Sequence, residues 1–267
     1  MFSTQVTDLL LLLQIRDVLG PLYGSEDLST MLYSLIRREK PQNIVELGTG
    51  LGVCTVWMAR GAKENGFGHV FTVDDARDET LALNYLNQVS DRLPVELRLG
   101  MAASYADYLS TLSQTCGLSN YITYCQATLA VGTNDLLAPG IYPFQEGGID
   151  LLLADFAHGP EAIMDILAYF LPLMSECASI FIDSASTHLP SFLVLERVIQ
   201  QLNQSKMPQR FLAVTSRQRR WDLFEIVTQR TFRLMHLIER RDRPQNSTAW
   251  IRIEPTDWIP HPLSMLH

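Results

Sequence analysis

The sequence has little of what marks membrane-spanning, secreted or nucleic-acid-binding proteins. No apolar stretch approaches the roughly 20 residues that a membrane-spanning helix needs. The leucine run 9–13 has neither a basic region before it nor a small-residue cleavage site after it. Lys and Arg total 21 against 29 Asp and Glu, a net charge of −8, so no broad basic face is expected. We therefore predict a cytoplasmic protein that binds neither nucleic acid nor a membrane.

Cysteine is sparse as well, and no two cysteines stand in a CxxC pair. The four are Cys54, Cys116, Cys125 and Cys177. In a chain of 267 residues, scattered cysteines are typical of reduced, buried thiols rather than of a disulfide framework. With 47% hydrophobic residues, the chain can bury a core without such staples.

What the chain does have is a strand, a glycine-rich turn and a helix in direct succession. The apolar run 43–47 is followed by the turn 48–52, Gly-Thr-Gly-Leu-Gly, and by the helix-compatible segment 53–63. Glycines let a backbone turn tightly and approach a ligand closely. This arrangement is the nucleotide-cradling unit of an open α/β sheet.

Further apolar runs alternate with helix-compatible segments along the chain. The predicted strands are 43–47, 69–73, 121–126, 149–154, 179–182, 211–215 and 248–253. Segment 231–238 fits either a hairpin partner of the last strand or the end of a helix that begins near 221. The alternation predicts the α/β class: a Rossmann-like, doubly wound, mostly parallel seven-stranded sheet with helices on both faces.

The domain organisation follows from these elements. Residues 1–42 form two helices ahead of the first strand, an N-terminal helical cap; 43–255 form the Rossmann-like domain, and 256–267 a C-terminal tail. The third strand is either 95–99 or 121–126, and we favour the latter. Residues 76–100 then become an insertion that could cover the substrate as a lid.

Polar residues stand at the ends of four predicted strands. They are Glu46 to Gly52, Asp74, Asp155 to His158, and Asp183 with Ser184. Because ligands of open α/β sheets bind at the carboxyl ends of the strands, we expect these groups to meet at one edge.

The glycine-rich turn departs from the dinucleotide fingerprint G-x-G-x-x-G, because Val53 stands at its last glycine. Glu46, two residues before the first glycine, would repel a pyrophosphate. An aminoacyl-sulfonium cofactor would not meet that repulsion. The turn therefore counts against an NAD(P)-dependent oxidoreductase, which remains the alternative together with a non-catalytic cofactor-binding domain.

On these residues the chain resembles the class I S-adenosylmethionine-dependent methyltransferases over about 43–185. Residues 46–52 are similar to their first motif, and Asp74 matches the acid that holds both ribose hydroxyls in that family. Gln126 stands where the family contacts the adenine amino group, usually through an acid. The resemblance implies these cofactor-binding residues: Glu46, Gly48, Thr49, Gly50, Gly52, Asp74, Gln126 and Asp155.

The spacing Asp155-x-x-His158, with Asp183 after the next strand, resembles the metal-dependent small-molecule O-methyltransferases, both the catechol type and natural-product sugar enzymes. The resemblance implies a Mg²⁺ ion held by Asp155, Asp183 and Ser184, since hard cations prefer oxygen ligands. It also implies catalytic roles for Asp155 and His158, with His158 as general base. Ser184 departs from the asparagine that is usual after the second acid.

The resulting hypothesis is transfer of a methyl group from S-adenosylmethionine to a hydroxyl of a small, natural-product-like substrate. A homodimer is an open possibility. Four aromatic residues fit either an aromatic substrate pocket or the core: Tyr105, Tyr108, Trp221 and Trp258.

Overall fold

The structure is a computed structural model, and it describes residues 2–23, 26–98, 104–132, 136, 148–238 and 247–257. Trp258, most of the predicted tail and most of the segment 127–148 lie outside the described residues. So does Ser25, which the sequence predicts as the cap of the second helix.

Seven strands form one sheet in the order β3-β2-β1-β4-β5-β7-β6. They are β1 (Asn43–Leu47), β2 (His69–Asp74), β3 (Ile122–Gln126), β4 (Ile149–Ala154), β5 (Met174–Asp183), β6 (Arg230–Ile238) and β7 (Ser247–Pro255). Strands β1 to β5 are mutually parallel, whereas β7 runs antiparallel to β5 and β6. The order reverses between β1 and β4, so the predicted doubly wound, mostly parallel sheet is confirmed.

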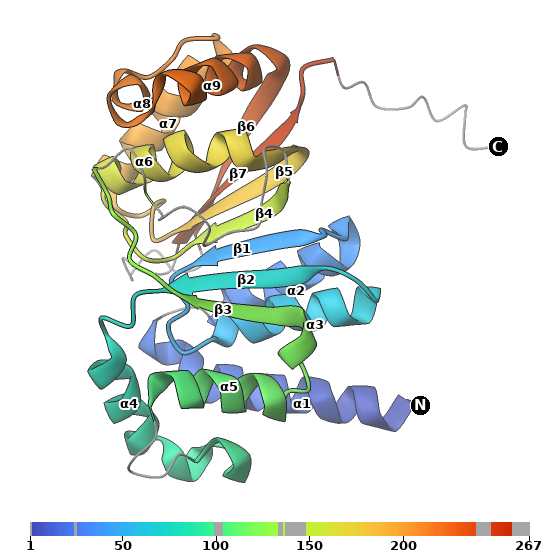
Figure 1. Ribbon diagram of the computed structural model, residues 1–267. Coiled ribbons are helices and arrows are strands. Elements are labelled where there is room, and N and C mark those ends of the chain that lie inside the picture. Colours follow the sequence, from blue (N-terminus) through green and yellow to red (C-terminus); the bar gives the residue numbers. More distant parts are fainter. Residues whose placement is uncertain are drawn as a thin grey trace, which may run out of the picture.

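Helices cover both faces of this sheet (Figure 1). One face carries α1 (Phe2–Leu19), α2 (Glu26–Glu39), α3 (Val53–Asn65), α4 (Glu79–Gln88) and α5 (Tyr105–Thr115). The other carries α6 (Pro160–Phe170), α7 (Leu189–Asn203), α8 (Gln209–Val214) and α9 (Arg217–Gln229). Among the described residues, no helix is long and apolar enough to cross a membrane.

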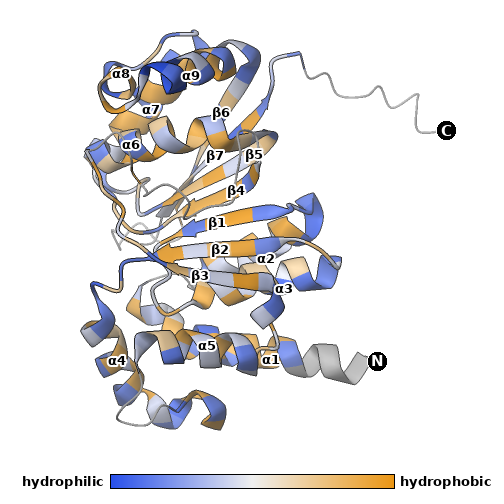
Figure 2. Cartoon of the chain, in the orientation of Figure 1, coloured by the Kyte–Doolittle hydropathy of each residue, from blue (hydrophilic) through white to orange (hydrophobic). Residues whose placement is uncertain are grey.

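Two hydrophobic cores follow from the alternation of strand side chains. Ile44 of β1 packs with α1 to α5, whereas its neighbour Val45 packs with α6 to α9. The central strands are buried on both faces, which explains their nearly continuous apolar sequence. Figure 2 shows this as hydrophobic colour along β4 and β5.

The structure decides the secondary structure of three segments that the sequence left ambiguous or predicted wrongly. The third strand is Ile122–Gln126, as favoured, and Val95–Leu97 forms a 3₁₀ helix. The predicted strand 211–215 is wrong: Gln209–Val214 is helical, because Phe211 and Val214 fall three residues apart on one buried helix face. Residues 231–238 are the hairpin partner of β7, reached after α9 ends at Gln229.

None of the four cysteines forms a disulfide, as predicted, but they are not all buried. Cys54 and Cys116 are buried, Cys125 is partly buried and Cys177 is exposed. Cys177 lies in the first half of β5, where the burial of this long strand is interrupted. The prediction of a buried thiol is therefore wrong for Cys177.

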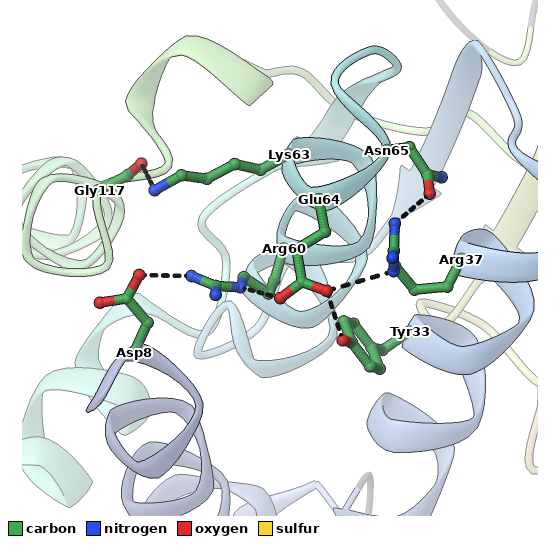
Figure 3. Close-up of polar contacts among 8 residues, drawn as sticks. All are labelled: Asp8, Tyr33, Arg37, Arg60, Lys63, Glu64, Asn65 and Gly117. Carbon is green, nitrogen blue, oxygen red and sulfur yellow. Dashed lines mark hydrogen bonds and ion pairs between the residues drawn. The ribbon is translucent and has the colours of Figure 1, made fainter. Parts of the chain in front are cut away.

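Helices α1, α2 and α3 are joined by an ion-pair network centred on Arg60 (Figure 3). The Arg60 guanidinium is only 2% exposed; its Nη1 lies 2.6 Å from Asp8 Oδ2 and its Nε lies 2.7 Å from Glu64 Oε1. The other Glu64 oxygen accepts from the Tyr33 hydroxyl at 2.7 Å and pairs with Arg37 at 3.2 Å. The network holds α3, the helix that begins at the glycine-rich turn.

Candidate active site

A cavity of about 470 Å³ opens at the carboxyl ends of β1, β2 and β4. The segments that follow these three strands form most of its wall, and Tyr23, α3, α4, α5 and the segment after β3 contribute the rest. Parallel strands bring their carboxyl ends to one edge, so the polar strand ends singled out in the sequence meet here.

The glycine-rich turn forms one wall of the cavity in a conformation that requires glycine. Gly48 has φ = +91°, and a Cβ there would lie 2.2 Å from the carbonyl oxygen of Asp155. Gly50 has φ = +51°, and its Cβ would lie 3.1 Å from the ring of Tyr23. Backbone without side chains therefore faces the cavity, a cradle that suits a ligand approaching closely.

Asp74 ties this turn to the end of β2. Its Oδ2 accepts from the backbone N–H of Thr49 at 2.9 Å and of Gly50 at 3.2 Å, and its Oδ1 accepts from Ala76 N–H at 2.7 Å. A carboxylate offers roughly four acceptor sites, and three are taken here, so about one remains for a ligand hydroxyl. Asp74 thus shapes the cradle and lines the cavity.

Glu46 lies beneath the turn, 1% exposed, and reaches the cavity from the α3 side. It accepts a hydrogen bond from the Thr55 hydroxyl. Beside it, the hydroxyls of Thr49 and Thr72 are hydrogen-bonded to each other, with 2.6 Å between the two oxygens. Burial raises the pKa of Glu46 to about 8, and the hydrogen bonds from Thr55 and Thr72 offset only part of that rise.

Asp155, His158 and Asp183 converge beyond the glycine cradle. The pairing of Ala154 with Ile182 places the residues after β4 and at the end of β5 side by side. One ligand atom from each of the three side chains lies within 4.8 Å of the others. Burial and the charge of Asp183 raise the pKa of Asp155 well above its ordinary value, and burial also raises the pKa of Asp183.

The ring of His158 is oriented by the backbone of β5. Its Nδ1 lies 3.0 Å from the carbonyl oxygen of Asp183. Because a carbonyl can only accept, Nδ1 carries the hydrogen, and the neutral ring keeps its lone pair on Nε2. The Ser191 hydroxyl donates to the His158 carbonyl and fixes the main chain of the same residue.

Ser184 adopts the left-handed backbone conformation with φ = +56°. Its hydroxyl donates to Asp183 Oδ2 at 2.7 Å, and its N–H donates to the carbonyl of Ser247 at 2.7 Å. The serine therefore orients the second acid through its side chain. A direct ligand role for Ser184 stays a prediction.

The remaining predicted residues lie at the margins. Gly52 caps α3 and does not line the cavity; Gln126 is exposed at the end of β3, and the next residue, Ala127, does line it. The adenine contact of Gln126 stays a prediction. Of the four aromatics, Tyr105 lines the cavity, Tyr108 is core and Trp221 is 64% exposed.

Sequence reasoning missed Tyr23 and the acids of 75–79 as parts of this wall. Tyr23 follows α1 after a short 3₁₀ helix, Gly20–Leu22, and comes to the cavity only through the packing of the N-terminal helices. The acids stand just after Asp74, and their position after a strand end was the available signal.

A family model described as a methyltransferase domain matches residues 45–185. Several solved structures are similar at low identity. An O-methyltransferase from Streptomyces achromogenes, TomG, in complex with SAM is 17% identical over 86% of this chain and 81% of its own, with a TM-score of 0.46. An O-methyltransferase from Bacillus cereus in complex with SAH is 14% identical, covering 93% of this chain and 91% of its own, with a TM-score of 0.47.

No curated protein sequence matches the chain. The family model, by contrast, spans more than half of it and includes both the glycine-rich turn and the segment from Asp155 to Asp183. The chain therefore belongs to the methyltransferase-domain family.

Proposed function

We propose that the protein transfers a methyl group from S-adenosylmethionine to a hydroxyl oxygen of a small molecule, assisted by Mg²⁺. One observation carries the proposal: Asp155, His158 and Asp183 converge beside the glycine cradle at the carboxyl edge of the sheet. An acceptor hydroxyl held there would face a cofactor in the cradle.

The residues present fit both groups. The backbone of 48–50 and the spare acceptor capacity of Asp74 suit the ribose end of the cofactor. The two carboxylates, Asp155 and Asp183, suit a divalent cation, and the imidazole beside them keeps Nε2 available as a base. No observation favours hydride transfer, since Val53 fills the place of the third glycine and is buried.

The side chains divide the chemistry between them. Asp155 and Asp183 would hold the cation, which would supply a Lewis acid that lowers the pKa of the acceptor hydroxyl. His158 accepts the hydroxyl proton at Nε2, while the Asp183 carbonyl holds its ring in that tautomer. The glycine cradle and Asp74 fix the methyl donor for in-line attack, and positioning supplies much of the rate.

The proposal also covers the lid segment, the location in the cell and the oligomeric state. Residues 76–79, the start of the proposed lid segment 76–100, line the cavity, which supports a role of this segment in covering the substrate. Four cysteines as thiols, none of them in a disulfide, support a cytoplasmic location. A homodimer remains to be tested by light scattering in solution.

The proposal is tested by methyl transfer to a panel of catechols and sugar hydroxyls, with Mg²⁺ and with EDTA. We expect His158→Gln to lower kcat by about 10²- to 10⁴-fold, because general-base catalysis contributes that much. His69→Gln is the matched control, since His69 lies at the amino end of β2 and bonds Thr123. Full turnover in the presence of EDTA would contradict the role of Mg²⁺. Turnover of His158→Gln at the wild-type rate would contradict the role of His158 as general base.

A further inference from the structure

Tyr23 covers the glycine cradle from outside the sheet. Its ring lies against the glycine-rich turn, with Cε2 at 3.1 Å and Cδ2 at 3.2 Å from where a Cβ on Gly50 would stand. It is the only residue before β1 that lines the cavity among those the structure describes. An aromatic ring therefore borders the cavity beside the turn.

The wall around Tyr23 is strongly acidic. Among the described residues, four carboxyl groups line the same cavity besides Glu46 and Asp155, whose pKa values burial raises: Asp74, Asp75, Asp78 and Glu79. Against them, among the described residues of the wall, stands one arginine, Arg77, which is 77% exposed and pairs with Asp75 at 2.9 Å. The cavity thus favours a positively charged occupant.

Tyr23 also lies between the two ends of the site. Burial, followed by the charges of Asp78, Asp74 and Asp155, raises the pKa of Tyr23 to about 12, so its phenol stays neutral. Asp74 closes β2, where the proposed function places the ribose, and Asp155 follows β4, where it places the acceptor. The sulfonium of S-adenosylmethionine is bonded to the ribose carbon on one side and carries the methyl that must face the acceptor.

We propose that the Tyr23 ring and the acids around it select the cationic methyl donor over its neutral product, S-adenosylhomocysteine. The inference rests on the proposed function. A sulfonium over the ring face gains a cation–π attraction that the thioether of the product lacks. Loss of the methyl cation to the acceptor therefore removes a favourable interaction at this wall and promotes release of the product.

The test is isothermal titration of the wild type with S-adenosylmethionine, S-adenosylhomocysteine and sinefungin, which carries an ammonium group near the position of the sulfonium. We expect both cations to bind more tightly than the neutral product. Tyr23→Leu should lower the ratio of the two dissociation constants, product over donor, by about three- to tenfold. Tyr23→Phe should keep the ratio, because the ring remains.

Tyr121→Leu is the control, since Tyr121 is partly buried and lies outside the cavity wall. An unchanged ratio in Tyr23→Leu, with either no loss of affinity or equal loss for donor and product, would overturn the inference. Failure of the proposed function looks different: the wild type would bind none of the three ligands, or would bind them without methylating any hydroxyl. Circular dichroism confirms that each variant is folded before titration.

Discussion

The molecule holds two clusters of carboxyl groups that are at least partly shielded from water, and their charges are compensated in different ways. In the Arg60 network, burial alone would raise the pKa of Glu64, but hydrogen bonds from Tyr33 and Arg60 and the charges of Arg60 and Arg37 lower it below its ordinary value. At the carboxyl edge of the sheet, burial and mutual repulsion raise the pKa of Asp155 instead. Neither Asp155 nor Asp183 pairs with a lysine or arginine within the described part of the chain.

The difference separates a structural cluster from a functional one. The first contains its own cation, so its charges stabilise the packing of α1, α2 and α3 without any ligand. The second is left with like charges that an outside cation can relieve. The same substitution, loss of one charge, should therefore have opposite effects on the stability of the two clusters.

The largest effect is expected at the cluster that holds its own cation. Arg60→Met should lower the free energy of unfolding by about 3 kcal/mol, because it leaves Glu64 partly buried without its main partner. The measurement is urea denaturation followed by circular dichroism. Asp8→Asn is the comparison, since Asp8 is 38% exposed and its loss should cost less than about 1 kcal/mol. Equal losses in the two variants would contradict the central place given to Arg60.

The sequence predicted one of these clusters and not the other. Asp155 and Asp183 each mark the end of an apolar run, and parallel strands align such ends, so their meeting follows from local pattern and sheet topology. Asp8 and Arg60 are 52 positions apart on two helices. Only the packing of α1 on α3 brings them together, and no sequence pattern marked Arg60 as buried.

Local pattern also explains the other successes and errors. Strand β1 and the turn after it are recognisable because an apolar run meets three glycines within five residues. The strand predicted at 211–215 failed because a short apolar segment fits either period, and the contacts of Phe211 and Val214 in the second core decide for a helix. No sequence pattern indicated that Tyr23 lines the cavity, because its position depends on how the N-terminal helices pack.

Glu46 offers an intermediate case, a buried acid with hydroxyl partners but no cationic partner among the described residues. Its pKa is about 8 in the folded protein against an ordinary 4.5. Between these values the folded state keeps a proton that the unfolded state has lost, so stability falls as pH rises through this window. One such proton changes the free energy of unfolding by up to about 1.4 kcal/mol per pH unit. Between pH 6 and pH 7.5 the wild type should therefore lose about 2 kcal/mol more stability than Glu46→Gln.

The measurement is urea denaturation of wild type and Glu46→Gln without cofactor at several pH values. The difference between the two curves isolates Glu46 from Asp155 and Asp183, which titrate in both proteins. Parallel curves would show that Glu46 is already ionised near pH 6. Glu46 would then make no contribution to the pH dependence of stability in this range.

The smallest effect is expected at the second cluster, and it has the opposite sign. Asp183→Asn should raise the stability of the metal-free protein by about 1 kcal/mol at pH 8, since it removes one of two facing charges. The asparagine oxygen can still accept from the Ser184 hydroxyl. Mg²⁺ should raise the Tm of the wild type in a concentration-dependent way and leave the variant nearly unchanged. If Asp183→Asn destabilised the metal-free protein as Arg60→Met does, the acids would be partners in the packing of β4 against β5 rather than a site that awaits a cation.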